Sequence, residues 1–76
     1  MNKFVICVNS KGCEASLEKW KLYPVLEEDE VSGFIRIIDE TKEDYLYPKD
    51  YFLAVELPVV VAEKLEKEYF AEIEEV

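Results

Sequence analysis

Side chains that could do chemistry are scarce in this chain. There is no histidine, so no side chain has an unperturbed pKa close to neutrality and could serve as a general base. Ser10, Ser16 and Ser32 have no partner base within sequence reach, as an activated nucleophile requires. Cys7 falls in an apolar run, where a thiol is usually inert, and Cys13 has no strongly electropositive neighbourhood. We therefore expect a protein that is not an enzyme.

Metal and cofactor sites are not expected either. A structural zinc site needs about four nitrogen or sulfur ligands, and the chain offers two thiols. The acidic run at residues 27–30 does not follow the alternating oxygen spacing of a calcium loop. With only Gly12 and Gly33, there is no glycine-rich loop to cradle a phosphate. Free thiols are expected in a reducing compartment, although a bridge between Cys7 and Cys13 stays open.

Aromatic side chains are the best candidates for a binding surface. Tyrosine and tryptophan dominate interface hot spots, because a large rigid ring ends in a polar group. Alternation along a strand places Tyr45 and Tyr47 on one face. The same rings could instead fill or rim a core, and the sequence leaves this open. The residues predicted to contact a protein partner are Trp20, Phe34, Tyr45, Tyr47, Pro48 and Tyr51.

The charge balance restricts the kind of partner. Eighteen acidic residues against nine basic ones give a net charge of −9. Such a surface repels nucleic acids and anionic membranes, because phosphate binding depends on lysine and arginine. It attracts basic proteins, although the same charge can also serve solubility alone. No apolar run is long enough to span a membrane, and polar residues 9–11 follow the first apolar residues too early for a signal peptide, so we expect a cytoplasmic protein.

The elements that must position these residues are mostly strands. Short apolar segments bounded by polar turns predict strands at residues 4–8, 22–26, 34–38, 45–47 and 52–57, with one helical turn over 48–51. This spacing is typical of a small barrel or sandwich. Positions expected in the core are Val5, Ile6, Val8, Leu22, Val25, Leu26, Ile35, Ile37, Leu46, Val55 and Leu57.

A change of period at Pro58 predicts a C-terminal helix. Proline suits the first helical position, where its missing N–H is no loss. From Val61 onward apolar residues recur at helical spacing through positions 62, 65, 69, 73 and 76, and Phe70 widens the stripe. An isolated helix of this length is marginal in water, so something must cover the stripe. Either the chain's own strands cover it, or a second copy does so in a homodimer.

One segment resembles SH3 domains. In residues 47–52, a strand runs into a short Pro-x-x-Tyr turn before the last strand, and residues 21–26 are similar to the strand that follows the long first loop of these domains. The resemblance implies a mainly β, five-stranded SH3-like barrel over residues 1–57, with the C-terminal α-helix at 58–76 as part of the same domain. Of the groove that binds polyproline in SH3 domains, only Pro48 and Tyr51 carry over, with Phe34 near the place of the groove tryptophan.

A narrower resemblance rests on the segments 14–17 (EASL) and 43–48 (EDYLYP). These are similar to segments of a set of short bacterial proteins without an assigned activity. Together the residues favour a small protein-interaction module or accessory subunit that binds its partner through an aromatic barrel face. The alternative is an acidic decoy that mimics nucleic acid and inhibits a basic nucleic-acid-binding protein such as a defence nuclease.

Overall fold

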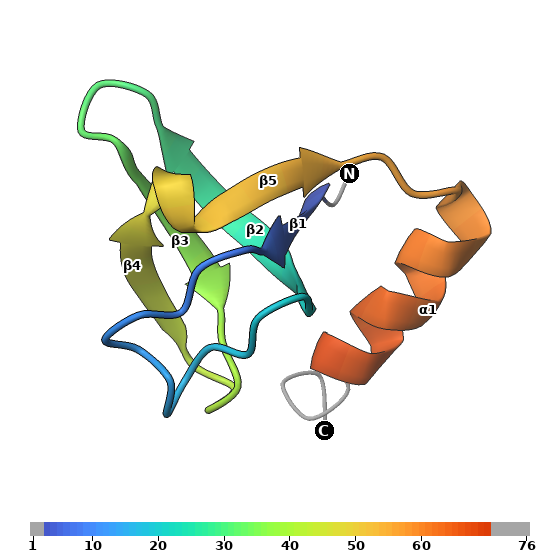
Figure 1. Cartoon of the computed structure of the whole chain (residues 1–76). Coiled ribbons are helices and arrows are strands. Elements are labelled where there is room, and N and C mark those ends of the chain that lie inside the picture. Colours follow the sequence, from blue (N-terminus) through green and yellow to red (C-terminus); the bar gives the residue numbers. More distant parts are fainter. Residues whose placement is uncertain (1–2, 71–76) are drawn as a thin grey trace.

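The computed structural model describes residues 3–70, with side chains for residues 3–69. Its elements follow one another as β1 (Lys3–Cys7), β2 (Leu22–Asp29), β3 (Phe34–Ile38), β4 (Asp44–Pro48), the 3₁₀ turn η1 (Lys49–Tyr51), β5 (Phe52–Val55) and α1 (Val59–Phe70) (Figure 1). The prediction of a mainly β chain with five strands and a C-terminal helix is confirmed. The part of the predicted helix at residues 71–76 lies outside the described residues.

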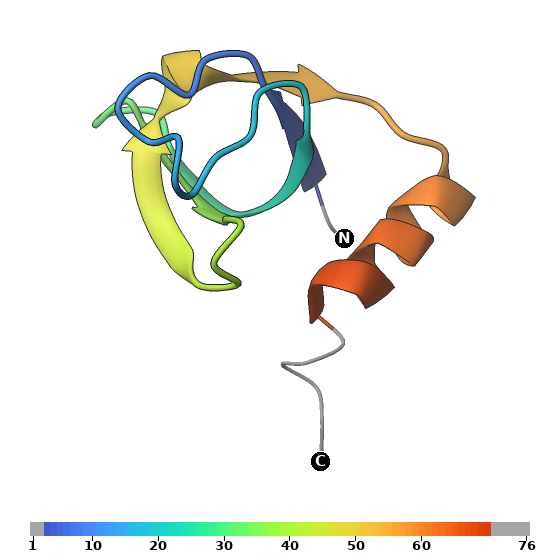
Figure 2. The same ribbon diagram turned by 60° about the horizontal axis from the view of Figure 1, so that its bottom comes forward.

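The five strands form one antiparallel sheet in the order β4-β3-β2-β1-β5. Consecutive strands pair from β1 to β4, and β5 then returns to pair with β1, where Phe4 lies opposite Val55. The sheet is strongly curled, with β4 and β5 as its two edges (Figure 2). No pairing joins these two edge strands among the described residues, so the ladder is not closed into a barrel.

Two positions expected in the core lie on the outside. The register of β2 against β3 shifts between Val25 and Glu27, and this irregularity leaves Leu26 47% exposed. Leu46 pairs with Arg36 on the outer face of β3 and β4 and is 53% exposed, because its neighbour Tyr47 takes the inward position. The expectation that Leu26 and Leu46 pack inside is therefore wrong.

The core is more aromatic than the sequence suggested. A series of tilted and edge-on ring contacts, with centroids 6.2–6.4 Å apart, links Tyr47 to Phe52, Phe52 to Tyr23, Tyr23 to Tyr69 and Tyr69 to Phe4. Such tilted pairs stabilise beyond the area they bury. The buried apolar residues are Phe4, Val5, Cys7, Leu17, Tyr23, Ile35, Ile37, Ile38, Tyr47, Phe52 and Tyr69. The remaining predicted core positions, Ile6, Val8, Leu22, Val25, Val55 and Leu57, are partly buried.

Helix α1 packs on the sheet through one narrow stripe. Ala62 and Leu65 pack against the core, and Tyr69, one turn further, is part of it. The Tyr69 hydroxyl donates a hydrogen bond to the carbonyl oxygen of Leu22. The helix therefore covers its stripe with the chain's own sheet, the first of the two predicted arrangements, whereas Val59 and Val60 stay exposed. Within residues 3–70, no helix is both long and apolar enough to cross a membrane.

We expect Ile37→Ala to destabilise the fold by about 2–5 kcal/mol, because it leaves a cavity at a fully buried position of a central strand. Denaturant unfolding followed by circular dichroism measures this loss. Leu46→Ala, on the outer face, is the control and should change the unfolding free energy by less than about 0.5 kcal/mol. Equal losses for the two variants would show that the facing of β3 and β4 is wrong.

We expect Tyr69→Ala to cost on the order of 3 kcal/mol, since it removes a buried aromatic anchor of α1 and its hydrogen bond to β2. Val60→Ala, at an exposed helical position, should cost less than about 0.5 kcal/mol. The measurement is the midpoint of thermal unfolding for both variants. A Tyr69→Ala protein that melts with the parent would mean that α1 does not stabilise the sheet.

Candidate functional site

A pocket of about 360 Å³ opens between the sheet and the last turns of α1. Three segments that are distant in the sequence line it: the start of β2 with the two residues before it, the turn between β3 and β4, and the helix. The lining residues are Trp20, Lys21, Leu22, Asp39, Glu40, Lys42, Leu65, Glu68 and Tyr69. A concave site with a few convergent polar groups is the usual form of a binding site.

Trp20 stands at this pocket in an unusual backbone conformation. Its φ is 72°, in the left-handed region that non-glycine residues rarely adopt. The conformation is held by its own N–H, which donates a 2.6 Å hydrogen bond to the carbonyl oxygen of Cys7. The indole nevertheless remains 66% exposed, and the ammonium of Lys19 lies 5.7 Å from the ring centroid. A large, mostly exposed aromatic ring thus projects from a constrained backbone.

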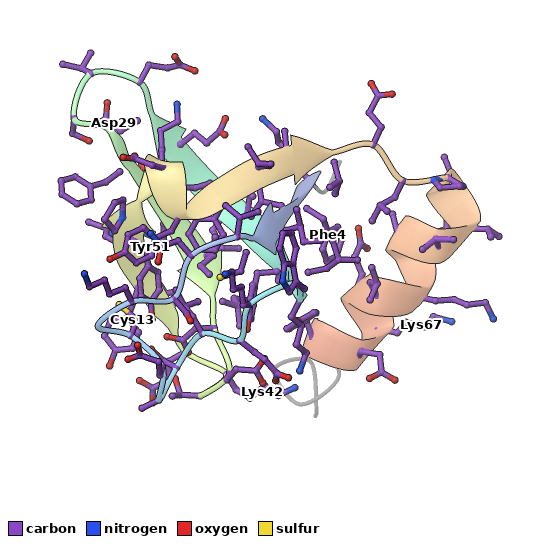
Figure 3. All side chains as sticks on the ribbon, in the orientation of Figure 1. Phe4, Cys13, Asp29, Lys42, Tyr51 and Lys67 are labelled. Carbon is purple, nitrogen blue, oxygen red and sulfur yellow. The ribbon has the colours of Figure 1, made fainter. Side chains whose placement is uncertain are left out.

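Lys42, which also lines the pocket, has a similar left-handed backbone conformation. Its φ is 70°, and its N–H donates to the carbonyl oxygen of Asp39 at 3.0 Å. The Lys42 ammonium lies 5.3 Å from the ring centroid of Tyr69, so Lys42 reaches the last turns of α1 (Figure 3). Trp20 and Lys42 are the only non-glycine residues with positive φ in the described part of the chain. Such strain clusters at functional sites, because packing must maintain it.

Asp39 lines the pocket and is fully buried. One carboxylate oxygen accepts hydrogen bonds from the Thr41 N–H at 2.9 Å and the Thr41 hydroxyl at 2.5 Å. The other accepts a bond of 2.5 Å from the Tyr47 hydroxyl, which also lies 2.9 Å from the Ser16 hydroxyl. No ion pair in the described chain involves Asp39, so neutral donors satisfy its carboxylate. Burial, reinforced by this bond to Asp39, raises the pKa of Tyr47 to about 12.

A second polar group joins the two walls of the pocket. The Tyr23 hydroxyl donates to Glu40 at 2.7 Å and accepts from the Glu18 N–H at 2.8 Å. Glu40 also pairs with the Lys21 ammonium at 2.9 Å. Burial acts to raise the pKa of Glu40, but the hydrogen bonds from Lys21 and Tyr23 outweigh it and hold this pKa below its ordinary value. Burial raises the pKa of Tyr23 well above the ordinary tyrosine value, so Tyr23 remains a neutral donor.

Of the six residues predicted to contact a partner, only Trp20 lines this pocket. Tyr45 borders a separate, shallower groove of about 350 Å³, which Ser16, Asp39, Thr41, Leu46 and Tyr47 also line. Tyr45 is half exposed, whereas Tyr47 is 7% exposed and belongs to the core. The Tyr47 hydroxyl is bound to Asp39 and its ring packs on Phe52, so little of this side chain is left for a partner.

The other three predicted contact residues lie apart from Trp20. Phe34 and Pro48 pair across β3 and β4 and face outward, since their neighbours Ile35 and Tyr47 face inward. Tyr51, in η1, is partly buried, and its hydroxyl donates to the carbonyl oxygen of Lys11 at 2.8 Å. Tyr51 thereby fastens the long first loop to η1. The structure does not bring the six residues together into one face.

Sequence reasoning missed Lys21, Glu40, Lys42 and Tyr69 as pocket residues, because the pocket forms only when the helix packs against the turn. Asp39 did carry a signal. An aspartate at the end of an apolar strand, followed by threonine two positions later, is typical of a turn in which the carboxylate caps the backbone. Within residues 3–69, no group of three or more His, Cys, Asp or Glu side chains could hold a metal ion.

We expect Tyr47→Phe to destabilise the protein by about 1–3 kcal/mol, since it removes one of three donors from a fully buried carboxylate. The measurement is urea unfolding. Tyr45→Phe is the matched control on the same strand: its hydroxyl makes only an exposed bond to Glu43, so its loss should cost less than about 0.5 kcal/mol. Equal costs would contradict the assignment of Tyr47 to a buried network.

Comparison with protein-family models, with curated proteins and with solved structures finds no match to this chain. The function is therefore argued from the pocket and the charges around it.

Proposed function

We propose that this chain is a small protein-interaction module, and that a protein partner docks at the pocket beside Trp20. The single observation that carries this proposal is the exposed indole of Trp20 on a constrained backbone. We propose a binding role and not a catalytic one, in a cytoplasmic setting. Burial raises the pKa values of Cys7, Tyr23 and Tyr47, which makes these groups poorer nucleophiles and bases at neutral pH.

The energetics of Trp20 support docking. An indole left in water forgoes the free energy of burying its apolar surface, about 25 cal/mol per Å². Its backbone conformation adds a cost of roughly 1–2 kcal/mol that most positions avoid. A partner that covers the exposed ring recovers this free energy of burial on binding. Tryptophans beside a pocket are frequent centres of interface hot spots.

We also infer that the curled sheet is an SH3-like barrel. In support, the strand order β4-β3-β2-β1-β5 is a meander whose last strand returns to the first, and η1 follows Pro48 at the Pro-x-x-Tyr segment. The polyproline groove is not part of the proposal. Phe34 faces outward beside Pro48, while the Tyr51 hydroxyl is tied to Lys11. Docking of a polyproline helix needs several parallel aromatic rings on one surface.

The decoy alternative is weakened by the acidic run at residues 27–30. Glu27 pairs with Arg36 at 3.4 Å, Glu28 with Lys3 at 2.9 Å and Glu30 with Lys49 at 3.7 Å. Asp29 instead accepts hydrogen bonds from the N–H groups of the following turn, which lower the pKa of its carboxyl. A mimic of nucleic acid needs carboxylates free to replace phosphates, and this run is largely engaged. The net charge of −9 still favours a basic protein as the partner and disfavours nucleic acid.

We expect Trp20→Ala to weaken capture of the partner from a lysate of the source cells by at least about thirty-fold, the effect of losing a hot-spot side chain. Alanine keeps the Cβ and hence the backbone strain, so the fold should persist in circular dichroism. Phe34→Ala, an exposed aromatic on the outer face, is the matched control and should bind like the parent. Quantitative mass spectrometry of the retained proteins measures both.

Two results would go against the proposal. Retention of the same proteins by Trp20→Ala would show that the pocket is not the docking site. Loss of every retained protein at moderate salt, for the parent and both variants alike, would favour the decoy, because exposed charge–charge attraction is screened at that ionic strength.

A further inference from the structure

The charges and ring faces around the pocket also indicate which side chain it accepts. We propose, on the basis of the proposed function, that the pocket binds an arginine side chain of a basic protein partner, with its guanidinium over the rings of Trp20 and Tyr69 and beside the carboxylate of Glu68. The inference depends on two independent observations: what the ring faces already attract, and the sign of the charge that lines the pocket.

Each aromatic ring of the pocket already has a cation over it. The Lys19 ammonium lies 5.7 Å from the centroid of Trp20, and the Lys42 ammonium lies 5.3 Å from that of Tyr69. Both distances fall within the roughly 6 Å over which the ring quadrupole attracts a cation. The chain's own lysines therefore show that the two ring faces are accessible to positive charge. In the free protein, Lys19 and Lys42 thus occupy these ring faces weakly.

The charge of the lining favours a cation as well. Asp39, Glu40 and Glu68 contribute three carboxylates, and Lys21 and Lys42 two ammonium groups. Glu40 is neutralised by Lys21 at 2.9 Å. Asp39 is satisfied by neutral donors, and no ion pair among the described residues involves Glu68. The lining residues alone thus carry one more carboxylate than ammonium groups, with Lys19 outside the lining over Trp20, in a chain whose net charge of −9 steers basic proteins toward it.

Arginine is better suited than lysine to displace the internal cation from Tyr69. Its guanidinium is planar, stacks on aromatic faces and is more weakly hydrated than an ammonium, so it loses less when water is excluded. The Lys42 backbone is fixed by its bond to Asp39, but its four-carbon side chain can swing into solvent. Lys42 therefore competes with the incoming guanidinium. As a result, we expect that removing Lys42 strengthens the binding of arginine, although Lys42 itself lines the pocket.

The test is a titration of the ¹⁵N-labelled full chain with three amino-acid probes, followed by amide and indole shifts. The probes are N-acetyl-arginine amide, N-acetyl-citrulline amide, which has the same shape without the charge, and N-acetyl-glutamate amide. We expect arginine to shift the Trp20 indole and the amides of Lys21, Lys42 and Tyr69, with an affinity about two- to five-fold above that of citrulline. Glutamate should leave these signals in place.

Two charge variants, each with a matched control, test whether the pocket favours a positively charged side chain. Lys42→Ala should tighten arginine binding about two-fold or more, whereas Lys49→Ala, which removes a lysine paired with Glu30 at 3.7 Å, should not. Glu68→Gln should weaken it, whereas Glu63→Gln, at an exposed position of the same helix, should leave it nearly unchanged. Each pair changes the net charge equally, so only a local effect separates its members.

Several results would overturn the inference. Weaker arginine binding in Lys42→Ala would show that Lys42 does not compete with the guanidinium, and preferred binding of glutamate would show that the pocket takes an anion. Equal binding of arginine and citrulline would remove the role of charge, and an absence of shifts at the pocket would remove the site. These failures are distinct from failure of the proposed function, which is decided separately by whether Trp20→Ala still captures the partner.

Discussion

The buried carboxylate of Asp39 is the constraint on which most of the structure depends. A carboxylate out of contact with water is costly unless every oxygen is hydrogen-bonded, and here neutral donors from a turn and a neighbouring strand supply those bonds. Satisfying it fixes the turn after β3, because the backbone of Asp39 also bonds to Glu43 and Lys42. Through the Tyr47 hydroxyl the same network reaches Ser16 in the long first loop. A single ionisable group thereby sets the relative positions of three segments.

The pocket is a consequence of this arrangement. The turn that Asp39 organises presents Lys42 toward α1, and the first loop that it tethers leads into Trp20, two residues before β2. The helix completes the enclosure through Tyr69, whose ring continues the aromatic series that begins inside the sheet at Tyr47. The position of the surface that we propose for a partner therefore depends on buried residues. The backbone of this surface is held by the hydrogen bonds from Trp20 to Cys7 and from Lys42 to Asp39.

Much of the fold could be predicted from the sequence, because alternation and breaker residues are local signals. Each strand and the helix appear where apolar periodicity and Pro58 indicated them, apart from shifts of a few residues at their ends.

The positions of single side chains were harder to predict. Tyr45 and Tyr47 share a face by alternation, yet only Tyr47 reaches the core, since depth along a strand depends on what packs above it. Leu26 is turned outward by the register shift between Val25 and Glu27, whose effect on single side chains the alternation pattern does not give. The left-handed backbone conformations of Trp20 and Lys42 are not marked by a glycine in the sequence.

The sheet order has a consequence for how the chain acquires its structure. β1 is the first of the five strands to be synthesised, but it lies inside the sheet and needs β5 as its second neighbour. Until residue 55 is available, one edge of β1 has no partner, and its apolar residues Phe4 and Val5 lack their covers from β5 and α1. Pairing between such distant segments requires loop closure. The chain loses entropy before the strand contacts can stabilise it, and this slows folding. The nascent N-terminal strand is therefore the segment most in need of protection from misplaced pairing before the rest of the chain emerges.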